Sequence, residues 1–171
     1  MSVFPNSSRR RTNVHQAQAL VEFAIILPVM LVMTLGLIDL GRAFVFGVSV
    51  QEGSRQAARL AATANYDTSV TDSAVLGRLV GASIPALTGC LSQTTTQTCN
   101  GGSWTFTINV VNGGTTYTTI AAARTANALP GAQVTVTAAG AVALLPGLNT
   151  GAFGLSLPQI NVQGQSAMAI L

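Results

Sequence analysis

Residues 18–64 read QALVEFAIILPVMLVMTLGLIDLGRAFVFGVSVQEGSRQAARLAATA, and this stretch decides the fold. Thr34 is the only polar side chain between Phe23 and Ile38, and one carboxylate, Glu22, directly precedes the apolar run. Farther along, the apolar residues recur with helical spacing among polar ones. The stretch therefore predicts one long helix whose first half lies in a membrane.

The apolar run alone is slightly short for a complete span. A helix over residues 23–38 is about 24 Å long, whereas the hydrocarbon core of a bilayer is about 30 Å thick. The span is therefore expected to continue toward Val50, which places Asp39 and Arg42 near its outer boundary. Because these side chains are three residues apart, they share a helix face and predict an interfacial ion pair. A functional charge relay is the alternative interpretation.

The predicted leader, residues 1–17, is polar and basic, and we expect it to be disordered. Its three consecutive arginines, Arg9 to Arg11, favour retention of this end in the cytoplasm. A twin-arginine export signal is an alternative, but the apolar run begins a dozen residues too late for it. Cleavage by a signal peptidase after Ala43 is a second alternative, and Asp39 so close to that position argues against it.

Composition excludes several classes of function. Charged residues make up 8% of the 171 residues, mean hydropathy is +0.49, and the net charge of +3 comes from the leader. Beyond residue 17, five arginines balance five acidic residues, so no basic surface for nucleic acid is expected. The chain has no lysine, and its one histidine, His15, lies in the leader. We therefore expect neither an enzyme nor a bound cofactor.

Residues 65–171 predict an extracytoplasmic domain that begins with a second helix. Asp72 or Ser73 is a suitable N-cap, and the helix is expected to run to about Leu87. Its expected apolar set is Ala74, Leu76, Leu79, Val80 and Ile84.

Cys90 and Cys99 enclose eight residues well beyond the apolar stretch. If this region is exported, the two cysteines pair in an intramolecular disulfide; two free thiols are the alternative. Closing so short a loop stabilises a fold by ~2.5–3 kcal/mol in the chain-entropy model. Two cysteines are too few to ligate a structural metal, so no metal site is expected.

The apolar residues then alternate with a period of two, which is typical of strands. This alternation covers 104–110, 133–138 and the final residues 160–170. Asn112-Gly113-Gly114 predicts a hairpin turn, with a return strand from Thr115 to Ile120.

Together these patterns predict an α+β fold, a long N-terminal transmembrane helix followed by a small antiparallel sheet with one face on that helix. Residues 141–157, apolar but rich in glycine and proline, are expected to form a loop over the core. Gly53, Ala57 and Ala61 are small residues four apart, and we expect them to let another part of the same domain approach the helix closely.

The segments QALVEFAIILP (18–28) and GLIDLGR (36–42) resemble the TadE-like family of pseudopilins, or minor pilins, of the tight-adherence (Flp) pilus. VQEGSRQAARLAAT (50–63) is similar to that family's continuation of the helix. The strong resemblance covers about residues 17–62, and the C-terminal strands resemble the family more weakly. It implies a pilin-like fold and a single-pass protein of the bacterial cytoplasmic (inner) membrane, associated with a pilus.

The resemblance also implies specific sites and partners. A prepilin peptidase would cut between Ala17 and Gln18, although Ala17 stands where the family pattern has glycine, and an uncleaved membrane protein remains the alternative. Glu22 would be the assembly residue, paired with the N-terminal amine of a neighbouring subunit. The implied partners are the membrane, other pilus subunits and the assembly machinery. A single-span anchored binding protein and an exported enzyme are the competing function classes.

Overall fold

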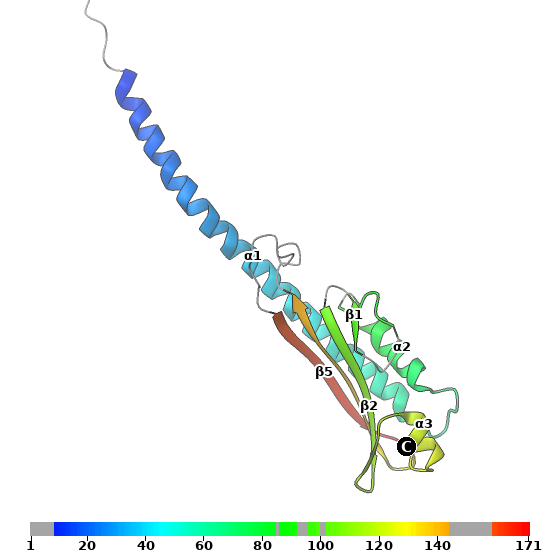
Figure 1. Ribbon diagram of the computed structural model, residues 1–171. Coiled ribbons are helices and arrows are strands. Elements are labelled where there is room, and N and C mark those ends of the chain that lie inside the picture. Colours follow the sequence, from blue (N-terminus) through cyan, green and yellow to red (C-terminus); the bar gives the residue numbers. More distant parts are fainter. Residues whose placement is uncertain (1–8, 85, 92–95, 100–101, 144–158) are drawn as a thin grey trace, which may run out of the picture. The chain divides into compact units, whose positions relative to one another are not determined.

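The computed structural model describes residues 9–84, 86–91, 96–99, 102–143 and 159–171. Its elements follow one another as α1 (Arg9–Ala62), α2 (Asp72–Ala82), β1 (Gln97–Cys99), β2 (Gly102–Asn112), β3 (Thr115–Tyr117), α3 (Ile120–Thr125), β4 (Gln133–Ala143) and β5 (Gln159–Ala169) (Figure 1). The chain forms two compact units, Met1–Leu40 and Gly41–Leu171, with the division inside α1. The predicted α+β class is confirmed: a long apolar N-terminal helix precedes a small antiparallel sheet.

α1 begins earlier than the sequence pattern indicated. It starts at Arg9, so the expectation of disorder is wrong for residues 9–17, and residues 1–8 lie outside the described part of the chain. Residues 9–17 contain no glycine or proline, and three of these nine residues are arginine, a good helix former. Such residues let a helix that is nucleated in the apolar run extend backwards at little cost. α1 also continues through Pro28 and ends at Ala62.

The sheet is antiparallel throughout. Its strand order is β1-β2-β4-β5, and β3 pairs with β2 on the side of the hairpin. The predicted turn at Asn112 joins β2 to β3, where Gly113 and Gly114 both adopt positive φ angles of 54° and 84°. Positive φ at both central positions is what a tight type I′ hairpin turn requires, and glycine provides it without strain.

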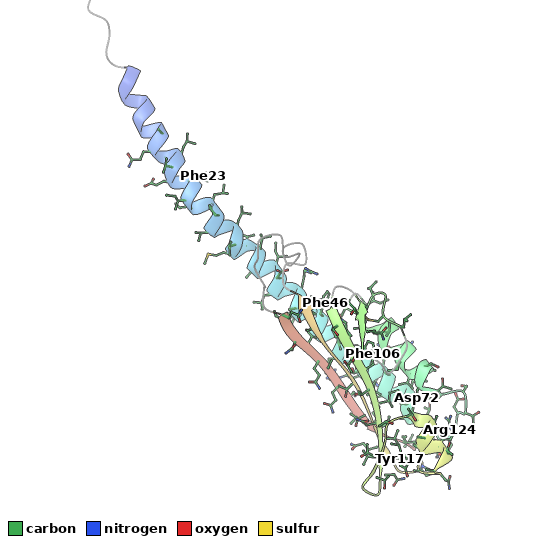
Figure 2. The ribbon with its side chains drawn as sticks, viewed as in Figure 1. Phe23, Phe46, Asp72, Phe106, Tyr117 and Arg124 are labelled. Carbon is green, nitrogen blue, oxygen red and sulfur yellow. A yellow bond between two sulfur atoms is a disulfide. The ribbon has the colours of Figure 1, made fainter. Side chains whose placement is uncertain are left out.

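Alternation in β2 and β4 builds the core. Trp104, Phe106, Ile108 and Val110 are all at most 1% exposed and belong to one hydrophobic core with residues of α1 and α2. Figure 2 shows Phe106 among them, between the sheet and the helices. Their register places Phe106 opposite Ala138 and Trp104 opposite Gly140. A Cβ atom on residue 140 would overlap the Trp104 ring, so glycine makes room for the indole.

α2 packs closely on α1 through small residues. A Cβ atom on Gly53 would overlap the hydroxyl of Ser83 and lie 2.7 Å from the carbonyl oxygen of Leu79. Ala57 and Ala61 are completely buried in the same core. These contacts agree with the expectation that the small-residue stripe packs against the domain itself.

The boundaries of α2 differ from the predicted ones. Thr71 is the N-cap, and its hydroxyl accepts a hydrogen bond from the Ala74 backbone N–H at 3.3 Å. The helix ends at Ala82, before the predicted end at Leu87. Pro85 explains this difference, because a proline disfavours helical geometry in the residue before it. That residue, Ile84, was expected in the core and is 63% exposed. The buried residues of α2 are Val75, Leu76 and Leu79.

The return strand is shorter than predicted, because β3 ends at Tyr117 and a short helix, α3, begins at Ile120. Thr119 is the N-cap of α3, and its hydroxyl accepts a hydrogen bond from the Ala122 N–H at 3.0 Å. The Asp72 carboxylate accepts a second one from the Ile120 N–H at 2.7 Å. Asp72 therefore stabilises the start of α3, which the sequence pattern did not indicate.

β4 extends to Ala143, so residues 141–143, expected in a loop, form strand instead. The remainder of that expected loop, residues 144–158, lies outside the described residues. Within the domain, β5 lies against α1: a Cβ atom on Gly164 would be 2.5 Å from the carbonyl oxygen of Val50. Glycine at this position lets the strand and the helix backbone approach closely.

Candidate functional site

The first candidate site is the exposed apolar half of α1. All residues from Ala17 to Ile38 are exposed, and most of the large apolar ones show more than half of their side-chain surface. Within residues 17–62 an 18-residue window has a mean hydropathy of 2.4, and none of that window is buried. Among the described residues, this is the one helix long and apolar enough to cross a membrane. Phe23 illustrates the pattern, because its ring points away from α1 and is 62% exposed (Figure 2).

The polar group inside this apolar run is satisfied by the helix itself. The Thr34 hydroxyl donates a hydrogen bond to the carbonyl oxygen of Met30 at 2.8 Å. A hydroxyl bonded in this way to the preceding turn needs no partner from lipid. The run from Phe23 to Ile38 is therefore compatible with hydrocarbon along its whole length.

Glu22 is a charged side chain next to this apolar run. It is exposed between Val21 and Phe23, which are 61% and 62% exposed. In the part of the chain that the structure describes, its carboxylate makes no ion pair and accepts no hydrogen bond. A carboxylate at the edge of hydrocarbon is unfavourable unless something pairs with it. A partner for Glu22 would therefore come from another molecule or from the headgroup region.

Ala17 and Gln18 lie in α1, five and four residues before Glu22, and both are exposed. The helix is continuous across the bond between them, which the resemblance identifies as the processing position. Nothing in the geometry of this bond distinguishes it from its neighbours.

Asp39 and Arg42 occupy different environments. Asp39 is 6% exposed, although Leu37 and Leu40 beside it are 72% and 61% exposed. The guanidinium carbon of Arg42 lies 5.8 Å from the centroid of the Phe46 ring, a cation–π distance. Phe46 itself is buried. The ion pair between Asp39 and Arg42 stays a prediction.

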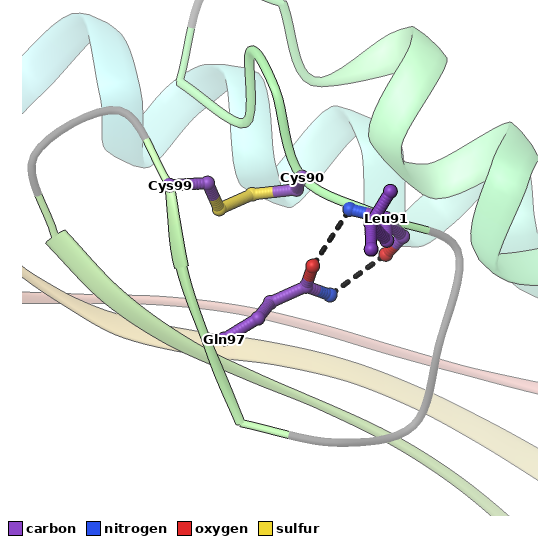
Figure 3. The surroundings of a disulfide bond; sticks show 4 residues. All are labelled: Cys90, Leu91, Gln97 and Cys99. Atoms are coloured by element: carbon purple, nitrogen blue, oxygen red, sulfur yellow. Dashed lines mark hydrogen bonds between the residues drawn. A yellow bond between two sulfur atoms is a disulfide. The ribbon is translucent and has the colours of Figure 1, made fainter.

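The predicted disulfide is present in the structure (Figure 3). Cys90 and Cys99 are joined with a Cα–Cα distance of 5.2 Å. Beside the bridge, the side-chain amide of Gln97 donates to the Leu91 carbonyl and accepts from the Leu91 N–H, both at 2.7 Å. The disulfide and this double hydrogen bond hold β1 to the segment that follows α2.

Arg124 has a structural role, because its side chain binds backbone carbonyl groups. Its guanidinium donates to the carbonyl oxygens of Ala64, Asp67 and Val70 at 2.9, 3.3 and 3.0 Å. These carbonyls belong to the turn that follows α1, where helix carbonyls lack intrahelical partners. Figure 2 shows Arg124 and Asp72 at this end of the domain. No local pattern predicts this contact, because 54 or more residues separate Arg124 from the groups it binds.

The described residues hold no group of three or more His, Cys, Asp or Glu side chains that could bind a metal ion. The carboxylates of the domain accept hydrogen bonds from backbone N–H groups or form surface ion pairs. Asp72, for example, accepts a hydrogen bond at the start of α3.

Comparison with known proteins identifies the N-terminal segment. The family model described as TadE-like protein matches residues 17–59, so the resemblance stated from the sequence is confirmed over this segment. The match covers most of α1 and none of the sheet. No curated protein and no solved structure is significantly similar to the chain. The matched segment is about a quarter of the chain, and it contains the one described helix that is long and apolar enough to cross a membrane.

Proposed function

We propose that this chain is a non-enzymatic, pseudopilin-like or minor-pilin-like subunit in the assembly of a tight-adherence pilus. The observation that carries the proposal is Glu22, an exposed carboxylate without a partner among the described residues of its own chain, at the start of an apolar helix. A simple membrane anchor has no use for such a group. A subunit that joins others through its helix does, because a neighbour's cation can neutralise the carboxylate.

We further propose that the N-terminus is cytoplasmic and the domain extracytoplasmic in a bacterial inner membrane. Arg9 to Arg11 support this orientation through the preference of short basic segments for the cytoplasmic side. The disulfide supports it as well, since such bonds persist in oxidising compartments. A membrane-impermeant thiol reagent tests it on the variant Thr116→Cys, an exposed position on β3. We expect labelling in intact spheroplasts, and labelling only after lysis would reverse the orientation.

Processing by a prepilin peptidase between Ala17 and Gln18 is part of this proposal. The family match begins at residue 17, next to the implied cleavage position. The partner of Glu22 would then be the new N-terminal amine, on Gln18 of a neighbouring subunit. Intact mass and N-terminal sequencing of the native protein distinguish this product from the uncleaved chain and from a chain cut after Ala43.

The substitution Glu22→Ala tests the assembly role directly. We expect membrane insertion to be unchanged, because an apolar side chain is more favourable there than a charge. We expect co-purification with other pilus subunits and filament counts to fall. Breaking a buried charge pair typically destabilises by ~3–5 kcal/mol, whereas a pair at the wet interface contributes about 1 kcal/mol or less. The size of the loss therefore reports how deeply the pair is buried.

Glu22→Asp is the matched variant, since it keeps the charge and shortens the side chain by one methylene. It should retain more assembly than Glu22→Gln, which keeps the length and loses the charge. All variants are compared at equal membrane levels. Full assembly by Glu22→Ala would favour the competing function, a single-span anchored protein whose outer domain binds a ligand.

A further inference from the structure

A groove on the domain is bordered by the C-terminal part of α1 and by α2, where both helices carry charged residues. Its volume is ≈ 610 Å³, and it is lined by Glu52, Gln56, Arg59, Leu60, Thr63 and Arg78. The α1 residues among them follow helical spacing, so they form one stripe along the helix. Arg78 comes from α2, so arginines of two helices border the same space.

The acidic residue of this groove is already engaged. The Glu52 carboxylate lies 3.9 Å from the Arg55 guanidinium, and it accepts a hydrogen bond from the Gln56 amide at 3.3 Å. Arg59 and Arg78 are exposed, and neither makes an ion pair or a hydrogen bond with any other described residue. Two guanidinium groups therefore border the groove without an ion pair among the described residues, and they outnumber the one carboxylate there, which pairs with Arg55.

The other charges of the domain are used elsewhere. Arg124 binds three backbone carbonyls, Asp72 accepts the Ile120 N–H, and Asp67 accepts two bonds from Ser69. The sheet face that points away from the helices carries serine, threonine, asparagine, glutamine and alanine and no charged residue on β2, β4 and β5. The groove is thus a positive site on a nearly uncharged domain, and such a site attracts and orients anionic partners.

We propose that this groove binds a carboxylate-rich segment of a neighbouring protein. Arginine forks match carboxylates in two-point hydrogen bonds, and the partly buried Leu60 offers apolar contact between the polar positions. From Glu52 to Thr63 the groove follows about 16 Å of helix rise. An extended peptide covers that length with about five residues, whereas one small anion occupies only a fraction of it.

A lipid headgroup is the weaker candidate. One headgroup, like one small anion, would occupy only a fraction of the groove. The proposal concerns the domain beyond Gly41 and is independent of Glu22.

The test is fluorescence anisotropy of a labelled eight-residue peptide of alternating glutamate and alanine, titrated with the full chain in neutral detergent micelles. The glutamine–alanine peptide is the control ligand. We expect the glutamate peptide to bind at least tenfold more tightly than its control and to weaken when salt is raised from 50 to 300 mM.

Arg59→Gln/Arg78→Gln should weaken this binding at least tenfold, while the matched double variant Glu52→Gln/Arg55→Gln, which removes both members of an ion pair and leaves the net charge unchanged, should change it less than twofold. Fluorescence of the buried Trp104 verifies that each variant is folded. Equal binding by wild type and the double variant would overturn the proposal, as would absence of binding. Displacement of the peptide by glycerol phosphate or inorganic phosphate at equal concentration would also overturn it, in favour of a headgroup or free-anion site.

Discussion

The side-chain amide of Gln51 forms two hydrogen bonds with the backbone of Gln165, 114 residues later in the sequence. Its Nε2 donates to the Gln165 carbonyl at 2.9 Å, and its Oε1 accepts from the Gln165 N–H at 3.2 Å. One amide thus satisfies both backbone groups of Gln165, which a further strand would otherwise bind. Because β5 is the last strand in the sheet order, this contact protects an edge that has neither charge nor proline.

Replacing Gln51 with alanine should destabilise the domain by about 1–2 kcal/mol, since two partly exposed hydrogen bonds are lost. Guanidinium unfolding of the full chain in micelles, followed by the fluorescence of Trp104, measures the change. Gln56→Ala is the control, because Gln56 bonds only to Glu52. We expect less than 0.5 kcal/mol there, in line with other surface substitutions. Equal midpoints for the two variants would mean that the Gln165 contact contributes nothing.

Gly53→Ala should be destabilising by about 1–3 kcal/mol, the usual effect of overpacking. The new methyl would overlap the Ser83 hydroxyl and crowd the Leu79 carbonyl, so α2 would have to move. Gly81→Ala is the matched control, since no atom lies within 4 Å of a Cβ there. That change should be neutral or stabilising by up to about 1 kcal/mol through helix propensity. Thermal unfolding compares the two, and the idea of a tight α1–α2 contact fails if Gly53→Ala is the more stable.

Reducing the disulfide should lower the free energy of unfolding by ~2.5–3 kcal/mol, because it releases the closed loop in the unfolded chain. Cys90→Ser/Cys99→Ser should show the same loss without reductant. Alkylation of the unfolded protein with and without reductant should differ by two sites. Two reactive thiols before reduction would show that the bond is absent from the native protein.

Acidification should weaken the turn after α1 through Asp67. Hydrogen bonds from the Ser69 hydroxyl and N–H lower the pKa of Asp67 below its ordinary value of 3.8, with a smaller contribution from Arg124. Because the folded state favours the carboxylate, the stabilisation is complete above the pKa of the unfolded chain. It is lost as the pH falls through the lower pKa of the folded state.

Asp67→Asn keeps an oxygen that can accept from Ser69 and removes the titration. Wild type should therefore be more stable than this variant at pH 6, and the difference should disappear toward pH 2. Chemical unfolding at both pH values measures the difference. A difference that is independent of pH would show that Asp67 acts through its shape and not through its charge.

Sequence patterns predicted the features that depend on the spacing of apolar residues or on one specific residue type. The apolar run of α1, the alternation around Phe106 and the glycines at the hairpin each encode a local geometry, and all three elements are present. The disulfide followed from spacing and expected compartment. These signals are strong because each depends on a few adjacent residues.

The missed features depend on residues that meet only in the folded chain. α3 has six residues, too few for a helical period, and a cap at Thr119 is its main sequence signal. β1 has three residues and is held by Cys99 and by pairing with β2. The role of Glu22 is a different case, because its partner would belong to another molecule. Likewise, the groove at Arg59 and Arg78 requires that two helices be placed side by side.

The contact between β5 and α1 also sets an order of events during synthesis. Gln51 leaves the ribosome 114 residues before its partner on β5, an interval of roughly 6–23 s at 5–20 residues per second. Until β5 is made, the helix backbone at Val50 lacks the strand that packs against it. A nascent chain of this protein therefore exposes part of an amphipathic helix for several seconds. A chaperone or an already inserted partner that binds this exposed surface would govern the yield of folded protein.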